Sequence, residues 1–131
     1  MSNATLDNEK TLGFLKKWNP NGPWVLTAIA VDEQGIDTQT FYPQQVDSLH
    51  RWLEQHNGKR NIYFHVNTAL KDLRKKAKRE DIKSVDWLHV DIDPEPGKDL
   101  DAEQERCLGL LTDKLPKGIP QPTCFVFSGG G

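Results

Sequence analysis

The sequence predicts an α/β or α+β fold in which helices pack on a mixed β-sheet, and three observations lead to this prediction. Segments with the two-residue period of strands and segments with the spacing of amphipathic helices mix along the whole chain. A length of 131 residues suits one domain with a single hydrophobic core. The longest apolar runs, such as residues 25–31, are far too short to cross a bilayer.

Composition and charge exclude several classes of protein. Hydrophobic residues make up 36% of the chain and charged residues 27%, which is ordinary for a globular protein. The net charge of -2 is not the strongly basic balance of a protein that coats nucleic acid. The chain does not begin with the basic and apolar segments of a signal peptide, and its two cysteines make neither a disulfide framework nor a zinc site. We therefore expect a cytoplasmic protein without a membrane partner, in which Cys107 and Cys124 are reduced core residues.

The start of the chain predicts a helix followed by a β-hairpin. Asp7 suits the N-cap of a helix that extends over residues 8–18, and the inward positions of that helix are Leu12 and Leu15. A run of asparagine, proline and glycine ends it. Strands are expected at residues 24–31 and 37–42, and an acidic turn joins them into a hairpin.

A second helix and a third strand are expected next. The helix begins after Pro43 and ends before Gly58, and its inward positions are Val46, Leu49, Leu53 and His56. Residues 61–66 then alternate with the two-residue period of a strand, which places on one face Ile62, Phe64 and Val66. A basic stretch follows, for which we expect a short helix or two in an irregular crossover.

The last third of the chain predicts a strand, a helix and a final strand. The first of these strands covers residues 85–93 and turns one apolar face inward, made by Leu88, Val90 and Ile92. A helix capped by Asp99 or Asp101 continues to Leu115, and its inward side chains are Cys107, Leu108, Leu111 and Leu115. The final strand covers residues 123–127.

Two carboxylates at the end of the strand over residues 85–93 are the strongest chemical signal. Side chains alternate along a strand, so Asp91 and Asp93 point to the same side, which they share with His89. At a separation of roughly 4–6 Å, their repulsion is on the order of 3–4 kcal/mol at an effective dielectric constant of 20. A divalent cation between them relieves this repulsion, and oxygen ligands favour Mg²⁺ or Mn²⁺.

Structural interpretations compete with the metal site. Asp99 and Asp101 have the same spacing, but they stand at the expected start of a helix, where aspartate is a common cap. Asp91 and Asp93 have no such explanation, although an exposed edge strand would leave both charges in water. His65, on the polar face of the strand over residues 61–66, is either a structural residue or a member of the site, and the same holds for His89.

The basic segment, residues 71–83, is a second signal. It contains seven lysines and arginines against three acidic residues, a local excess of 7 - 3 = +4 in an acidic chain. Such a run is either a solvated face or a contact with a phosphate backbone. The candidate phosphate ligands are Lys71, Arg74, Lys75, Lys76, Lys78 and Arg79.

The order of these segments resembles the archaeo-eukaryotic primase superfamily, in particular the replicative primase-polymerases of bacterial plasmids and prophages. The resemblance covers residues 60–131 and rests on the run Asn61-Ile62-Tyr63-Phe64-His65-Val66-Asn67, the lysine-rich crossover, and the strand that ends in Asp91-Ile92-Asp93-Pro94. In that superfamily an Asp-x-Asp pair at the end of a strand is the first catalytic motif. The run from Pro122 to Gly131 is similar to the strand that leads into the second.

The resemblance implies primer synthesis for DNA replication by two-metal nucleotidyl transfer. Asp91 and Asp93 would bind the catalytic Mg²⁺ or Mn²⁺ ions. Nucleotide contacts would come from Ser128, Gly129 and Gly130, with His65 and His89 nearby. Nucleoside triphosphates and a single-stranded DNA template would be partners, with a replicative helicase as a further domain or partner. The fold implied is an N-terminal α/β unit, residues 1–58, followed by the start of an RRM-like catalytic unit, residues 60–131.

The superfamily pattern also has parts that this sequence does not match. The second motif continues beyond its serine to a further polar residue, and the third motif is an additional strand with an acidic residue. We therefore expect the chain to be the front portion of a larger catalytic domain, with little or no polymerase activity by itself.

Two other interpretations stay open. A non-catalytic replication initiator would bind nucleic acid through the basic segment in a salt-sensitive way, without dependence on Asp91 or metal. A different Asp-x-Asp metal enzyme, such as a nuclease or a glycosyltransferase, would cleave DNA with manganese or bind a nucleotide sugar.

Overall fold

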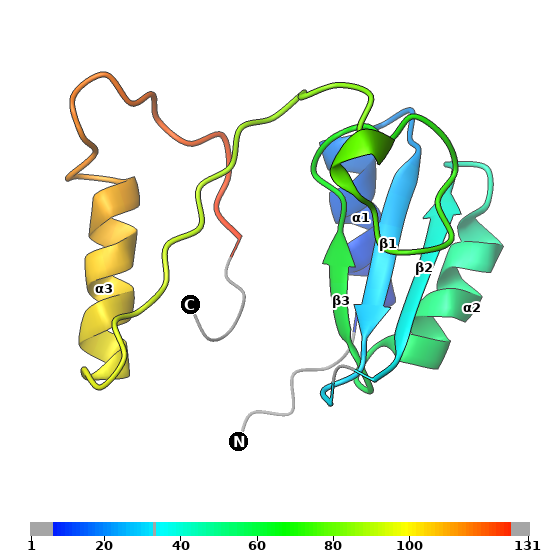
Figure 1. Ribbon diagram of the computed structural model, residues 1–131, viewed down its shortest axis with the longest axis horizontal. Helices are drawn as coiled ribbons and strands as arrows, with labels where there is room; N and C mark the ends of the chain where they lie inside the picture. Colours follow the sequence, from blue (N-terminus) through cyan, green and yellow to red (C-terminus); the bar gives the residue numbers. More distant parts are fainter. Residues whose placement is uncertain (1–6, 33, 127–131) are drawn as a thin grey trace. The chain divides into compact units, whose positions relative to one another are not determined.

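The computed structural model describes residues 7–32 and 34–126. The chain divides into two compact units, residues 1–88 and residues 89–131, and each is treated by itself (Figure 1). Among the described residues, none of the helices has the length and apolar character that crossing a membrane requires.

The first unit begins with the predicted N-terminal helix. Helix α1 (Asn8–Trp18) starts at Asp7, whose carboxylate accepts a hydrogen bond from the Lys10 amide at 3.0 Å. This bond satisfies one of the amides that lack a partner in the first helical turn. The two residues predicted to face inward, Leu12 and Leu15, are both buried. The local signals at the start of the chain therefore predicted this helix correctly.

The sheet of the first unit contains three antiparallel strands in the order β2-β1-β3. Strand β1 (Trp24–Ile29) lies in the centre and forms the predicted hairpin with β2 (Ile36–Phe41). Strand β3 (Asn61–Phe64) pairs with the other edge of β1 and is two residues shorter than expected. The α+β fold class is confirmed, but the sheet in the described part of the chain is antiparallel rather than mixed.

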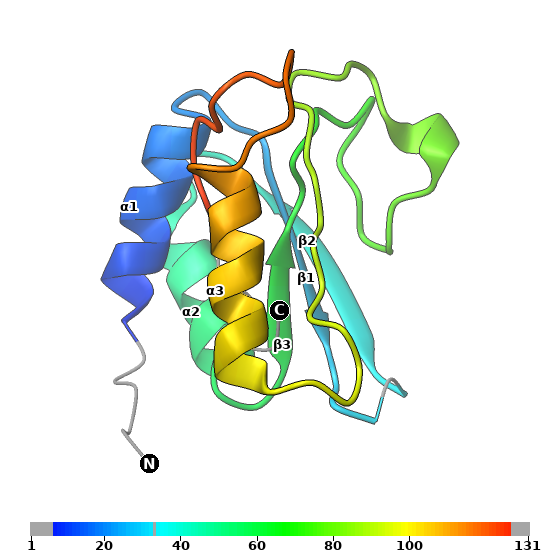
Figure 2. The same cartoon turned by 90° about the vertical axis from the view of Figure 1, so that its left-hand side faces the viewer.

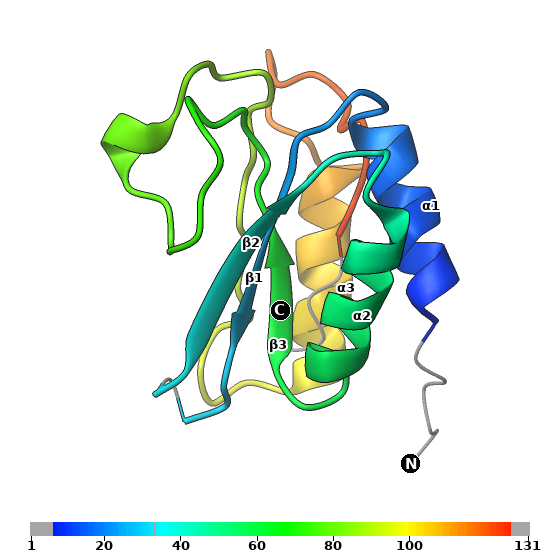
Figure 3. The same cartoon turned by 90° about the vertical axis from the view of Figure 1, so that its right-hand side faces the viewer.

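Helices α1 and α2 (Val46–His56) cover one face of this sheet, and residues 67–83 lie on the other side (Figures 2 and 3). The inward positions of α2 were predicted largely correctly, since Leu49, Leu53 and His56 are buried. The buried residues of this core are Leu12, Leu15, Trp24, Leu26, Ala28, Phe41, Leu49, Trp52 and Leu53.

A polar contact joins the sheet to α2 within this apolar layer. The Asp37 carboxylate, at the start of β2, accepts a hydrogen bond from the Trp52 indole at 3.0 Å. The same oxygen lies 2.8 Å from Nε2 of His56. Both partners are on α2, and both are buried. Asp37 therefore fixes the position of the helix along β2, because a buried donor without a partner is unfavourable.

Residues 85–93 do not form the predicted strand. The backbone from Lys83 to Glu95 has no regular secondary structure, and Leu88, one of the three residues expected to face the core, is 93% exposed. Alternation of apolar and polar residues favours a strand only when a second strand is available to pair with it. No strand of the described residues pairs with this segment, so it remains extended and irregular.

The predicted final strand is also absent from the described residues. Residues 123–126 have no strand assignment, and Cys124, Phe125 and Val126 are exposed. Cys124 is therefore not the core residue that was expected, whereas Cys107 is buried. The last residue predicted for this strand, Phe127, lies outside the described residues.

The second unit contains one long helix, α3 (Leu100–Leu111). Its start was predicted correctly: the Asp99 carboxylate accepts a hydrogen bond from the Ala102 amide at 3.0 Å. Of the residues expected to face inward, Cys107 is buried but Leu108 is exposed. The other buried position on this helix is Glu103, which the apolar pattern did not indicate.

Glu103 is bound on two sides, and this arrangement predicts an unusual titration. Its carboxylate accepts hydrogen bonds from the Arg106 guanidinium and, at 2.8 Å, from the Glu95 amide. Arg106 and then the Glu95 amide lower the pKa of Glu103 from 4.5 to about 2. Because the folded-state pKa is depressed, the stability that this contact contributes is fully present above about pH 4.5 and is lost as the pH falls through about 2.

The Glu95 amide resonance in an NMR pH titration reports directly on this contact. We expect its shift to have a midpoint near pH 2, and we expect no such transition in Glu103→Gln. A midpoint near the ordinary glutamate value would show that the Arg106 contact does not hold the carboxylate in solution.

Candidate functional site

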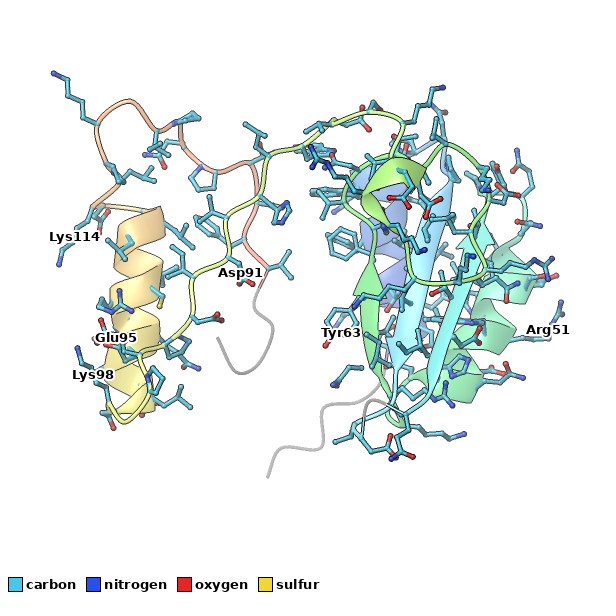
Figure 4. All side chains as sticks on the ribbon, in the orientation of Figure 1. Arg51, Tyr63, Asp91, Glu95, Lys98 and Lys114 are labelled. Carbon is cyan, nitrogen blue, oxygen red and sulfur yellow. The ribbon has the colours of Figure 1, made fainter. Side chains whose placement is uncertain are left out.

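Asp91 lies on the extended segment that leads to α3 (Figure 4), and Asp93 follows on the same segment. Both side chains are exposed, while Ile92 between them is half-buried. Neither carboxylate has an ion pair or a hydrogen bond to any of the residues that the structure describes. The segment is nevertheless tied to α3, because the Arg106 guanidinium donates to the Asp93 carbonyl oxygen at 3.5 Å. The pair is thus accessible and free to bind a cation.

The donor chemistry of this pair suits a partial metal site. Within the described ranges, no group of three or more histidine, cysteine, aspartate or glutamate side chains is placed to hold a metal ion. Magnesium typically takes one or two carboxylates from the protein and completes its octahedral shell with water and substrate phosphates. Two exposed carboxylates two positions apart in the sequence, without other partners among the described residues, therefore fit a metal that arrives with a nucleotide. They do not make a closed structural site.

The other residues predicted for the site are not assembled by the structure. His89 is exposed on the same extended segment as Asp91. His65 lies just beyond β3 in the first unit, where its Nδ1 is 3.1 Å from the Asn67 carbonyl oxygen. Ser128, Gly129 and Gly130 lie outside the described residues.

The basic segment forms a closed loop in the first unit. Its two ends pair: the Leu70 amide donates to the Asp81 carbonyl at 2.7 Å, and the Lys83 amide donates to the Thr68 carbonyl at 2.8 Å. An isolated antiparallel bridge joins Ala69 to Ile82 between these bonds. Only the short 3₁₀ turn Arg79–Asp81 is helical. The expected short helix is thus a single turn, and the segment is a loop rather than a crossover, because no strand follows it in the described residues.

The middle of this loop is anchored to the sheet. Leu73 is buried against Val25 and Ala69. The Leu73 amide donates to the Thr40 hydroxyl at 2.7 Å, and that hydroxyl lies 3.0 Å from the Leu73 carbonyl. All six basic residues predicted to contact phosphate are exposed: Lys71, Arg74, Lys75, Lys76, Lys78 and Arg79. The segment therefore presents its charge from a loop that is held at both ends and in the middle.

A second set of contacts, which the sequence did not indicate, holds residues 84–87 beside this loop. The Asn67 side-chain oxygen accepts from the amides of Asp86 and Trp87, both at 2.8 Å. The Asp86 carboxylate in turn accepts from the hydroxyls of Thr68 and Ser84, and these bonds lower its pKa. The sequence did not indicate this role, because a single aspartate in a predicted strand is not distinguished from other exposed polar residues.

Aromatic side chains border a cavity of about 230 Å³ in the first unit. Trp18 of α1 stacks on Trp87 with ring centroids 4.5 Å apart, and Phe64 packs edge-on against Trp18 at 5.4 Å. The polar walls come from His65 and Asp86. Asp86 is already bonded to its neighbours, and the stacking of Trp87 on Trp18 holds residues 84–87 against α1.

Comparison with known proteins gives no family for this α+β chain. No family model, no curated protein and no solved structure matches it.

Proposed function

We propose that this chain is part of a metal-dependent nucleotidyltransferase of the primase-polymerase type, which synthesises primers for plasmid or prophage DNA replication. The observation that carries the proposal is the pair Asp91 and Asp93, exposed on one segment and without a protein partner among the described residues. The segment order around this pair resembles the archaeo-eukaryotic primase superfamily. The proposed partners are nucleoside triphosphates, a single-stranded DNA template and a replicative helicase, and the proposed location is the cytoplasm.

The chemistry follows from the two carboxylates. Asp91 and Asp93 would hold Mg²⁺ or Mn²⁺, which activates a primer 3′-hydroxyl and neutralises the leaving pyrophosphate in such transfers. The two negative charges repel one another, so their affinity for a divalent cation rises with their proximity. The Arg106 contact to the Asp93 backbone holds the segment near α3 and reduces the freedom that metal binding must remove.

Calorimetric titration of Mn²⁺ tests this proposal, with and without a nucleoside triphosphate. We expect the wild-type chain to bind Mn²⁺ together with nucleotide, and we expect Asp91→Asn and Asp93→Asn to lose this heat signal. The physical reason is that each substitution removes half of the negative charge at the site.

Asp101→Asn is a matched control for these variants. Asp101 belongs to the second aspartate pair of the chain, is exposed, and lies in the first turn of α3. The same change of charge there should leave the titration unaltered. Manganese binding that survives in both Asp91→Asn and Asp93→Asn would contradict the proposal, and so would the absence of binding to the folded wild-type chain. A metal-independent nucleic-acid module would then be the better description.

A further inference from the structure

The face of the sheet opposite α1 and α2 has its own chemical character. Cross-strand pairs share a face, so Thr27 of β1 lies beside Thr38 of β2 and Tyr63 of β3. By the same alternation, Ile29 lies beside Ile36 and Asn61. We call this surface the open face. Its exposed part includes Tyr63 and Ile36, while Thr27 and Thr38 are buried on it, and the opposite face carries the main core.

A groove of about 430 Å³ runs between the open face and the basic segment. Thr27 and Ile29 line it from β1, and Lys76 and Ala77 line it from the loop. Tyr63 lines the same groove, and its side chain is 53% exposed (Figure 4). An aromatic ring thus lies across a groove from a lysine, both on backbone that the fold holds in place.

His65 lies in this groove with a defined orientation. Its Nδ1 faces the Asn67 carbonyl oxygen, which can only accept a hydrogen bond. The Nδ1 atom must therefore carry the hydrogen, so in the neutral ring Nε2 is a hydrogen-bond acceptor. Nε2 has no hydrogen-bond partner among the described residues, so it can accept a hydrogen bond from a ligand.

The charge beside the groove is positive, and part of the opposing negative charge is already engaged. Asp72 accepts a hydrogen bond from the Tyr42 hydroxyl at 2.6 Å, and Asp81 accepts from the Lys78 amide at 2.9 Å. Lys76 lines the groove, and the other exposed lysines and arginines belong to the same loop. The Leu73 anchor and the paired loop ends hold the backbone that carries them, so little ordering of this backbone is required when an anion binds.

We propose that the open face binds single-stranded nucleic acid, with one base stacked on Tyr63 and the phosphate backbone beside the lysines of the basic segment. Aromatic rings next to a basic track are the usual platform for unpaired bases, because every base has a face that stacks. A duplex hides those faces, so the groove selects single strands. This proposal adds a surface to the partner named in the proposed function, but it depends neither on metal nor on Asp91.

The test is fluorescence anisotropy of a labelled 20-nucleotide oligothymidylate with the whole chain, in EDTA, at several salt concentrations. Tyr63→Ala should weaken binding roughly 5- to 150-fold, the effect of losing one base stack, while Tyr63→Phe keeps the ring and should stay within about twofold. Tyr63→Thr repeats the loss with a residue that favours strands, which guards against a folding defect. Circular dichroism is the check that each variant is folded.

The charge contribution is tested with two double variants that change the net charge equally. Lys75→Gln with Lys76→Gln should lower the slope of log affinity against log salt by roughly 1–1.5, because each phosphate contact on a single strand contributes about 0.7. Lys16→Gln with Lys17→Gln is the control, since both residues are exposed on α1, on the other side of the sheet. It should leave the slope unchanged.

Three results would overturn this proposal. They are full affinity in folded Tyr63→Ala and Tyr63→Thr, equal affinity for a duplex of the same length, or an equal decrease of the salt slope in the control pair on α1.

Asp91→Asn separates this proposal from the proposed function. If the variant binds oligothymidylate normally in EDTA but takes up no Mn²⁺ with nucleotide, both proposals stand. If the wild-type chain binds the oligonucleotide but no metal, only the nucleotidyltransferase proposal fails.

Discussion

Phe41→Ala is expected to destabilise the first unit by about 3–5 kcal/mol, because it empties the centre of the core. Phe41 is 0% exposed and packs against Trp52 of α2, with ring centroids 5.8 Å apart. The substitution removes this aromatic pair and leaves a cavity that the surrounding strands cannot close completely. With a urea dependence typical of small domains, the midpoint of unfolding should fall by roughly 2 M.

Urea unfolding followed by tryptophan fluorescence measures this effect. Phe41→Leu is the first control and should lose less than about 1.5 kcal/mol, because it largely preserves volume and apolarity. Phe125→Ala is the matched control in the second unit, where the ring is half exposed, and it should change stability by less than about 0.5 kcal/mol. Equal midpoints for Phe41→Ala and the wild-type chain would show that this core is not formed in solution.

Trp24→Ala is expected to have a comparable effect, about 3–5 kcal/mol, for two separable reasons. The Trp24 side chain is buried among core residues of α1 and α2. Its indole also donates a hydrogen bond at 2.7 Å to the carbonyl oxygen of Asn19, the residue that ends α1. Removing the indole therefore creates a cavity and releases the end of the helix from the start of β1.

Trp24→Phe separates these two contributions, because it keeps an aromatic ring and removes the indole donor. We expect it to lose about 1–3 kcal/mol, part from the smaller ring and part from the lost indole hydrogen bond to the Asn19 carbonyl oxygen, which keeps its bond from the Gly22 amide. The measurement is the same urea titration, followed by far-UV circular dichroism because a reporter tryptophan is changed. A loss in Trp24→Phe as large as that in Trp24→Ala would contradict the role given to packing.

The first 64 residues could be predicted well because their signals are local. Asp7 is followed by the helical spacing of Leu12 and Leu15, and each of these signals acts within a few residues. The turn between β1 and β2 similarly joins two short runs of strand-forming residues. Local propensity and packing agree in this part of the chain, so the spacing of apolar residues and the capping and turn residues were sufficient to predict its helices and strands.

The prediction was wrong for residues 85–93 because a strand needs a partner. Leu88, Val90 and Ile92 have the spacing of an inward face, yet Leu88 and Val90 are largely exposed. In place of strand pairing, the backbone before them is held by the Asn67 side chain and by the hydroxyls around Asp86. These contacts join residues that are up to 20 positions apart, and no period in the sequence reports them.

Local signals in the sequence were sufficient to predict the α+β class, the helix starts at Asp7 and Asp99, and the hairpin. These follow from dihedral preferences, capping and apolar period, all of which act between near neighbours in the chain. The closure of the basic segment into a loop on the sheet, and the groove that Tyr63 and Lys76 line together, could be found only from the folded structure. Those features depend on strand pairing and burial between distant segments, and such contacts form only when the whole chain folds.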